Sequence, residues 1–105
     1  MDSKKSLNLL NNIGHIVTSE ITPNWTELFV EAEIDAELAD LCAWYLDENG
    51  EEHYPNITRE LVNCFVELRR NSKDDEKGAW TKCLYSLKSN GKYVIDFSYG
   101  KPRWS

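Results

Sequence analysis

Two alternating segments joined by a short turn, near the C-terminal end of the chain, constrain the fold more than any other sequence feature. Apolar and polar residues alternate over residues 80–88 and again over 92–99, with Ser89-Asn90-Gly91 between them. A period of two is typical of a strand that buries one face, and Asn-Gly favours a tight hairpin turn. The sequence therefore predicts an antiparallel hairpin at this end of the chain.

The length of the turn decides which residues of this hairpin face outward, because a shift of one residue turns every side chain over. A two-residue loop would mix apolar and polar side chains on both faces. A three-residue loop with Gly91 in the left-handed conformation instead aligns the apolar residues on one face. These residues are Cys83, Tyr85, Leu87, Tyr93, Ile95 and Phe97. We therefore predict the three-residue loop, with Trp80, Leu84 and Asp96 on the outward face.

The preceding part of the chain predicts two helices and two or three further strands. Apolar residues recur at steps of three or four along residues 7–21, which predicts an amphipathic helix over residues 3–20. A second helix is expected to begin after Pro55, with a cap at Asn56 or Thr58. The further strands are expected at residues 26–35, 41–46 and 52–54, the last two joined by a turn at Asn49-Gly50.

The length of 105 residues suits one modest hydrophobic core and is too short for two. The polar run at 71–78 is accordingly expected to be a solvent-exposed loop within one domain rather than a linker. The sequence predicts a single domain over residues 1–105 of the α+β class. Its expected architecture is an antiparallel sheet of four to five strands with two helices packed on one face, in the order α-β-β-(β)-α-β-β.

Charge is distributed unevenly along the chain. Residues 20–60 contain twelve acidic residues and one base, Arg59, whereas the rest of the chain contains six acidic and eleven basic residues. The net charge of -6 therefore combines a strongly acidic segment with a weakly basic remainder. The acidic segment would repel phosphate, which argues against direct nucleic-acid binding and favours a basic protein partner. The alternative interpretation is a solvated surface that only keeps the protein soluble.

The residues that could carry chemistry are few. The sequence lacks the short motifs of phosphate-binding loops, dinucleotide sites, metalloproteases and serine hydrolases. We expect His15 and His53 at the surface rather than in an acid–base pair. Glu31, Glu33 and Asp35 would share one strand face, where they could hold a hard cation, but a solvated face is the favoured interpretation. We therefore expect no catalytic residues, no metal and no cofactor.

The cysteines and the N-terminal segment predict a cytoplasmic protein. Cys42, Cys64 and Cys83 are odd in number and widely spaced, which is typical of reduced thiols, and we expect them in the core. The apolar residues near the N-terminus are interrupted by asparagines and a histidine, unlike the core of a secretion signal. No apolar run reaches the length of about 18 residues that spans a bilayer, so no membrane association is expected.

Two stretches resemble the YezG-like family of immunity proteins, or antitoxins, of bacterial polymorphic toxin systems. The segment that begins Asn24-Trp25-Thr26-Glu27-Leu28 is similar to one motif of that family, and residues 80–99, which begin Trp80-Thr81 and contain Asn90-Gly91-Lys92, are similar to its ending. The chain departs from the family in having Ala79 before Trp80 and a basic tail at 100–105. The resemblance implies a small cytosolic protein without catalysis that binds a cognate toxin domain, commonly a nuclease, and blocks it.

These observations combine into one functional hypothesis. The chain is expected to neutralise the C-terminal domain of a bacterial toxin, a nuclease of a contact-dependent or polymorphic toxin system, by covering its basic substrate surface. The alternative is a non-catalytic adaptor or regulatory subunit for another basic protein. The residues expected to bind the partner are Glu31, Glu33, Asp35, Asp47, Glu48, Glu51, Glu52, Trp80, Leu84 and Asp96.

Overall fold

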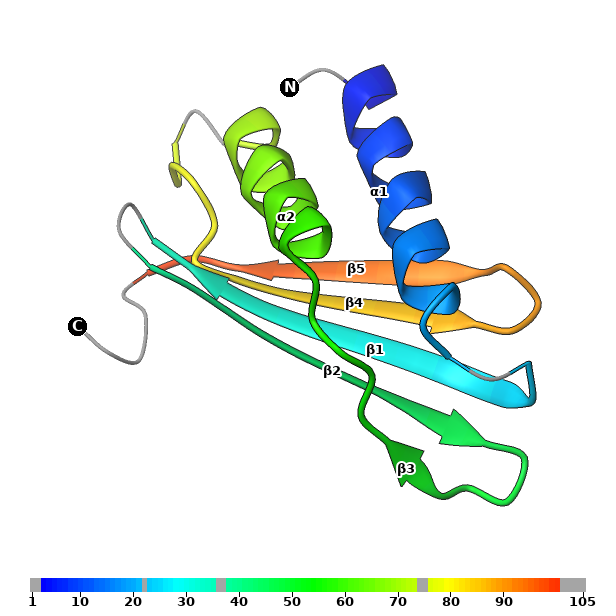
Figure 1. Cartoon of the computed structure of the whole chain (residues 1–105). Helices are drawn as coiled ribbons and strands as arrows, with labels where there is room; N and C mark the ends of the chain where they lie inside the picture. Colours follow the sequence, from blue (N-terminus) through cyan, green and yellow to red (C-terminus); the bar gives the residue numbers. More distant parts are fainter. Residues whose placement is uncertain (1–2, 22, 36–37, 74–75, 101–105) are drawn as a thin grey trace.

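The computed structural model describes residues 3–21, 23–35, 38–73 and 76–100. Within these residues it contains two helices and five strands, which confirms the predicted α+β class and element order. The elements are α1 (Ser3–Thr18), β1 (Trp25–Ile34), β2 (Ala39–Asp47), β3 (Glu52–His53), α2 (Arg59–Asn71), β4 (Lys82–Lys88) and β5 (Tyr93–Ser98). The strands form one antiparallel sheet in the order β3-β2-β1-β4-β5, and both helices lie side by side on one of its faces (Figure 1).

The hydrophobic core lies between the two helices and the sheet. Alternate residues of the strands point into it, among them Val30 of β1 and Tyr85 of β4, and they meet Ile13 of α1 and Phe65 of α2. Gly14 lets α1 approach the sheet closely, since a Cβ atom there would lie 3.2 Å from the hydroxyl oxygen of Tyr85. This packing places one face of the sheet against the helices, and neither of the described helices covers the other face.

The C-terminal hairpin has the predicted register. The backbone N–H of Lys88 donates to the carbonyl oxygen of Lys92, which closes a three-residue loop, and Gly91 has a φ of +90°. Within the hairpin, Cys83 pairs with Phe97, Tyr85 with Ile95, and Leu87 with Tyr93. The three-residue loop predicted from the apolar alignment is therefore confirmed, and Leu84 and Asp96 are paired on the opposite face of the sheet.

The predicted outward position of Trp80 is wrong. β4 begins at Lys82, so the alternation does not extend back to Trp80, and its side chain is completely buried. The indole N–H donates to the hydroxyl of Ser72 at 3.0 Å, and the ring stacks on Phe97 at 5.4 Å between centroids. Ser72 is itself buried, so the run at 71–78 is not wholly a solvent loop as predicted.

Local hydrogen bonds account for the ends of both helices. α1 ends at Thr18, two residues earlier than predicted. Near this end the hydroxyl of Thr18 donates to the carbonyl of Gly14 at 2.8 Å, and that of Ser19 donates to the carbonyl of Ile16 at 2.6 Å. The Ser19 bond satisfies a carbonyl group that the last turn leaves unpaired. At the start of α2, the hydroxyl of Thr58 accepts the backbone N–H of Leu61 at 3.1 Å, so Thr58 is the cap.

The three cysteines are free thiols in three different environments. Cys83 is buried beneath the helices, and burial raises the pKa of its thiol to about 12. Cys64 lies at the border of the core, where burial also raises its pKa, and Cys42 is exposed. The expectation that all three cysteines are core residues is therefore wrong for Cys42, because the open face of β2 carries it.

Candidate functional site

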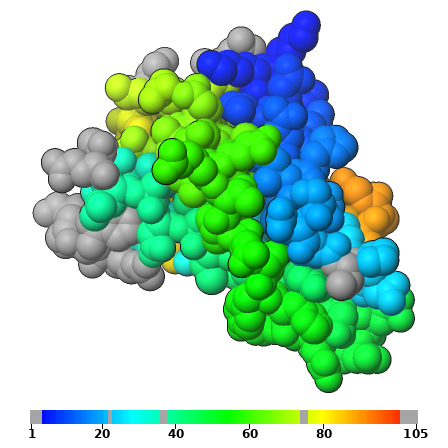
Figure 2. Space-filling model, viewed as in Figure 1, coloured from blue at the N-terminus to red at the C-terminus, as the bar shows by residue number. Residues whose placement is uncertain are grey.

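The face of the sheet opposite the helices is the candidate functional surface, and we call it the open sheet face. Among the described residues, both helices lie on the other face, the one that Figure 2 shows covered by α1 and α2. The strand register determines which side chains point to the open sheet face. They are Glu27, Phe29, Glu31 and Glu33 of β1, Asp40, Cys42, Trp44 and Leu46 of β2, Lys82, Leu84, Ser86 and Lys88 of β4, and Val94, Asp96 and Ser98 of β5.

An aromatic pair lies in the middle of the open sheet face. Phe29 and Trp44 are directly opposite each other in the ladder, and their rings stack with centroids 5.3 Å apart. Leu84 lies in the neighbouring row, and the side chain of Val94 at the sheet edge is 59% exposed. Aromatic residues at a partly exposed surface are the side chains that most often anchor protein interfaces.

Carboxylates border this aromatic pair. In the row next to it, Glu31 pairs with Leu84, and Leu84 pairs with Asp96 on β5. The ammonium group of Lys82 lies 3.6 Å from the carboxylate of Glu31, in a surface ion pair that contributes little to stability. Glu33 lies at the same end of β1 and is largely buried. The open sheet face thus combines an apolar centre with a polar border in which carboxylates outnumber the two lysines, Lys82 and Lys88.

The structure does not bring the predicted acidic residues together into one patch. Glu31 pairs with Cys42 on β2, and Cys42 is five residues, about 17 Å along the strand, from Asp47. Asp35 follows the end of β1, where its carboxylate accepts the backbone N–H of Leu38 at 2.7 Å. The other four predicted acidic residues are Asp47, Glu48, Glu51 and Glu52, and they lie in the hairpin between β2 and β3.

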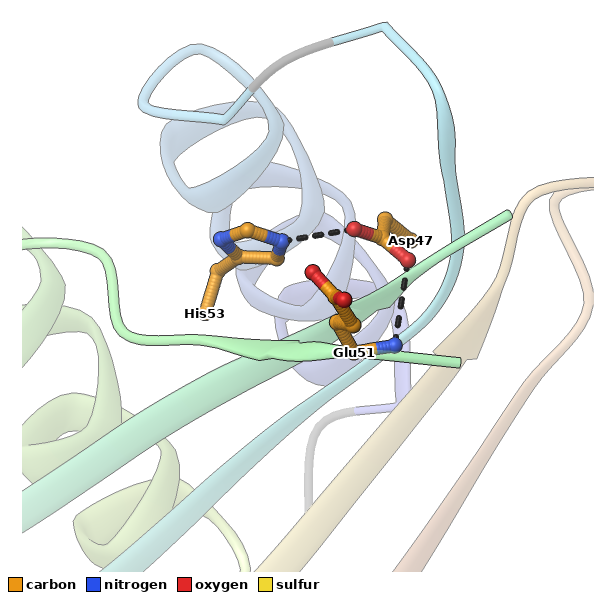
Figure 3. Close-up of side chains that lie close together, drawn as sticks. All are labelled: Asp47, Glu51 and His53. Atoms are coloured by element: carbon orange, nitrogen blue, oxygen red, sulfur yellow. Dashed lines mark hydrogen bonds and ion pairs between the residues drawn. The ribbon is translucent and has the colours of Figure 1, made fainter. Parts of the chain in front are cut away.

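This β2–β3 hairpin, residues 47–53, projects from the lower edge of the molecule in Figure 2 and is shown in detail in Figure 3. One oxygen of Asp47 accepts the backbone N–H groups of Asn49 at 2.8 Å and Glu51 at 3.0 Å. Its other oxygen lies 2.8 Å from the imidazole Nε2 of His53. The hydrogen bond from His53, followed by that from the Glu51 backbone, lowers the pKa of Asp47.

Sequence reasoning missed the aromatic pair, although part of its signal was visible. Phe29 stands in the polar series of the alternating β1 segment, where an aromatic residue is unexpected. Trp44 carries no such signal, because its strand is nearly uniformly apolar. Only the pairing of β1 with β2 places the two rings against each other.

The length and composition of the described helices decide whether either of them could span a membrane. In the described parts of the chain, none of the helices is both long enough and apolar enough to cross a bilayer.

Comparison with known proteins places the chain in a family. A family model described as "Immunity protein YezG-like" matches residues 48–103, more than half of the chain. The chain belongs to the YezG-like immunity protein family. The resemblance noted in the sequence is thereby confirmed.

Three curated proteins are similar to this YezG-like chain over most of its length. Immunity protein YezG of Bacillus subtilis (strain 168) is 25% identical over 83% of this chain and 68% of its own length. Immunity protein YezG of Bacillus spizizenii is 24% identical over 94% of this chain and 71% of its own length. The type VII secretion system protein EsaG of Staphylococcus aureus is 23% identical over 91% of this chain and 69% of its own length.

The YezG-like match covers part of the open sheet face. It begins at Glu48 in the β2–β3 hairpin and ends after β5, so it includes Leu84 and Asp96. The aromatic pair Phe29 and Trp44 lies on β1 and β2, before the matched region. The candidate surface is therefore built jointly from the matched strands and from two strands that precede them.

Proposed function

We propose that this protein neutralises a cognate bacterial toxin domain, a nuclease, by covering its basic substrate-binding surface with the open sheet face. The observation that carries the proposal is the stacked Phe29–Trp44 pair on a sheet face that neither described helix covers. The family membership supports an immunity role, and the names of the similar Bacillus proteins support it as well. In this proposal the protein acts in the cytosol as a binding protein and not as an enzyme.

The acidic and apolar parts of the surface have different roles in this proposal. A nuclease holds phosphate groups with basic side chains, so the carboxylates of Glu31 and Asp96 would approach a surface of opposite charge. Such exposed charges act mainly on the rate of association. Trp44 and Phe29 would be desolvated at the centre of the contact, where truncation of a residue acts mainly on dissociation.

Fewer of the predicted residues are proposed to contact the partner than the sequence suggested. Glu31, Leu84 and Asp96 stay in the proposed interface because they lie in the row next to that of the aromatic pair. Trp80 is removed from it, because a completely buried side chain cannot contact a partner while the core is intact. The carboxylates of the β2–β3 hairpin are proposed to lie at the periphery of the contact.

The proposal is tested by measuring binding kinetics with the cognate toxin domain. Trp44→Ala should raise the dissociation rate at least about 30-fold, which corresponds to about 2 kcal/mol for a desolvated aromatic anchor. The double variant Glu31→Lys/Asp96→Lys should instead slow association and reduce its dependence on salt. Each variant should retain the circular dichroism spectrum of the wild type.

A matched charge reversal on another surface is the control. Glu20→Lys/Glu60→Lys changes the net charge equally, and both residues are exposed away from the open sheet face. This control should affect association much less. The proposal is contradicted if the folded Trp44→Ala and Glu31→Lys/Asp96→Lys variants bind like the wild type. It is also contradicted if the toxin domain has no nuclease activity for the protein to inhibit.

A further inference from the structure

We propose that the β2–β3 hairpin binds a divalent transition-metal ion, with Zn²⁺ as the best fit, through Asp47, Glu51 and His53. One ligand atom of each residue lies within 4.8 Å of those of the other two. Figure 3 shows the three side chains converging, with the Glu51 carboxylate directed toward the Asp47–His53 pair. This inference does not depend on the proposed function.

Groups outside the cluster hold two of the three ligands in place. The imidazole of His53 stacks on the ring of Tyr45, with centroids 5.0 Å apart, and Tyr45 is buried. Asp47 is oriented by the backbone N–H groups of Asn49 and Glu51, which occupy one of its oxygens. The other oxygen is left facing His53 Nε2. A site whose ligands are oriented before the ion arrives binds it with less loss of side-chain freedom.

The third ligand distinguishes this cluster from an ordinary ion pair. An aspartate and a histidine satisfy each other without help, whereas a second carboxylate close to Asp47 is repelled by it unless a cation lies between them. Glu51 is exposed and can turn into solvent, yet a carboxylate oxygen of Glu51 lies within 4.8 Å of the ligand atoms of Asp47 and His53. A hollow of about 320 Å³ adjoins the pair and is lined in part by Asn24, Asp47 and His53, but not by Glu51.

The ligand set selects the type of metal. One imidazole nitrogen and two carboxylate oxygens suit Zn²⁺, which binds such ligands at roughly 2.0–2.2 Å and is commonly held by three protein ligands and one water. Ca²⁺ and Mg²⁺ prefer oxygen ligands alone, so the imidazole disfavours them. In a tetrahedral site the ligand atoms lie roughly 3.3 Å apart, so the exposed Glu51 side chain has to close in on the ion.

The site lies away from the centre of the proposed toxin-binding surface, on the side of the sheet that the helices cover. Along the strands, His53 and Tyr45 are paired and share the face of the sheet on which the helices pack. Trp44 and Leu46, which alternate with Tyr45, point to the open sheet face. Metal binding at the hairpin and protein binding at the open sheet face can therefore be measured separately.

The experiment is titration of untagged, chelator-treated full-length protein with Zn²⁺ by isothermal calorimetry. A Cys42→Ser background removes the one exposed thiol among the cysteines, which would otherwise compete for the ion. One ion per chain should bind, and Glu51→Gln and His53→Gln should each weaken binding at least tenfold. His15→Gln is the matched control, since His15 is the other histidine and is exposed on α1, and it should bind like the background protein.

Two further measurements test the metal site independently of calorimetry. Co²⁺ in place of Zn²⁺ should give visible absorption bands that Glu51→Gln, a change at an exposed residue, reduces without altering the circular dichroism spectrum. Ca²⁺ should compete only at concentrations far above those of Zn²⁺. The proposal is overturned if Zn²⁺ does not bind at concentrations below about 1 mM, or if His53→Gln and Glu51→Gln bind it as tightly as His15→Gln does.

Discussion

Replacing Trp80 with alanine should impair function by destabilising the fold and not by removing a contact with the partner. The indole fills the space beside Phe97 and donates a hydrogen bond to Ser72. The backbone carbonyl of Trp80 also accepts the Nε–H of Arg69 at 2.8 Å, so this residue joins α2 to the segment that precedes β4. Its removal leaves a cavity at a junction between three parts of the core.

The size of the effect follows from the burial of the side chain. Truncation of a fully buried tryptophan to alanine costs about 3–5 kcal/mol, whereas a small domain is stable by only about 5–15 kcal/mol. For a domain of this size, each kcal/mol shifts the melting temperature by about 4–8 °C. Trp80→Ala should therefore lower the melting temperature by about 12–40 °C. Trp44→Ala, at a partly exposed position, should lower it far less.

The assay measures thermal and urea unfolding of the two variants. Toxin binding is then measured at a temperature at which both variants are folded. Trp80→Ala should lose most of its stability and, in the fraction that stays folded, dissociate from the toxin at the wild-type rate. Trp44→Ala should keep most of its stability and dissociate from the toxin faster than the wild type. The reasoning is refuted if Trp80→Ala unfolds at the wild-type urea midpoint, or if Trp44→Ala is the more destabilised of the two.

Two further predictions concern the cysteines and the cap of α2. At pH 8 a thiol reagent should modify Cys42 quickly and Cys64 slowly. It should leave Cys83 unmodified until the protein unfolds, because that thiol is buried and burial raises its pKa to about 12. Mass spectrometry of the digested protein measures the order of modification, and a different order would contradict the prediction. Thr58→Ala should destabilise the fold by about 1 kcal/mol through loss of the cap, whereas Asn56→Ala should have little effect, as measured by urea unfolding; equal effects would show that Thr58 is not the functional cap.

The candidate site was only partly predictable. Glu31, Leu84 and Asp96 were assigned to an outward face by alternation and by the length of one turn, and the register confirms this placement. Trp80 was assigned to the same face by extending the alternation two residues too far. Alternation holds only while the chain stays in the sheet, and the sequence carries no clear mark of where β4 begins.

The sequence also did not predict how the carboxylates of the acidic segment are arranged in space. Its charge is a property of the sequence, but charge counted along the chain does not say whether the carboxylates meet in space. β2 runs for nine residues, so Glu33 and Asp47 lie near its opposite ends although both belong to one acidic segment.

The sequence alone determined the class and order of the elements, the register of the last hairpin and the family resemblance, because periodicity and turn residues act locally. The tertiary structure decided what depends on how the strands pair. The β1–β2 ladder brings Phe29 against Trp44, and the β2–β3 turn brings His53 against Asp47 and Glu51. Packing against α2 and Phe97 draws Trp80 inward, because burying an indole with a hydrogen-bonded N–H is more favourable than exposing it.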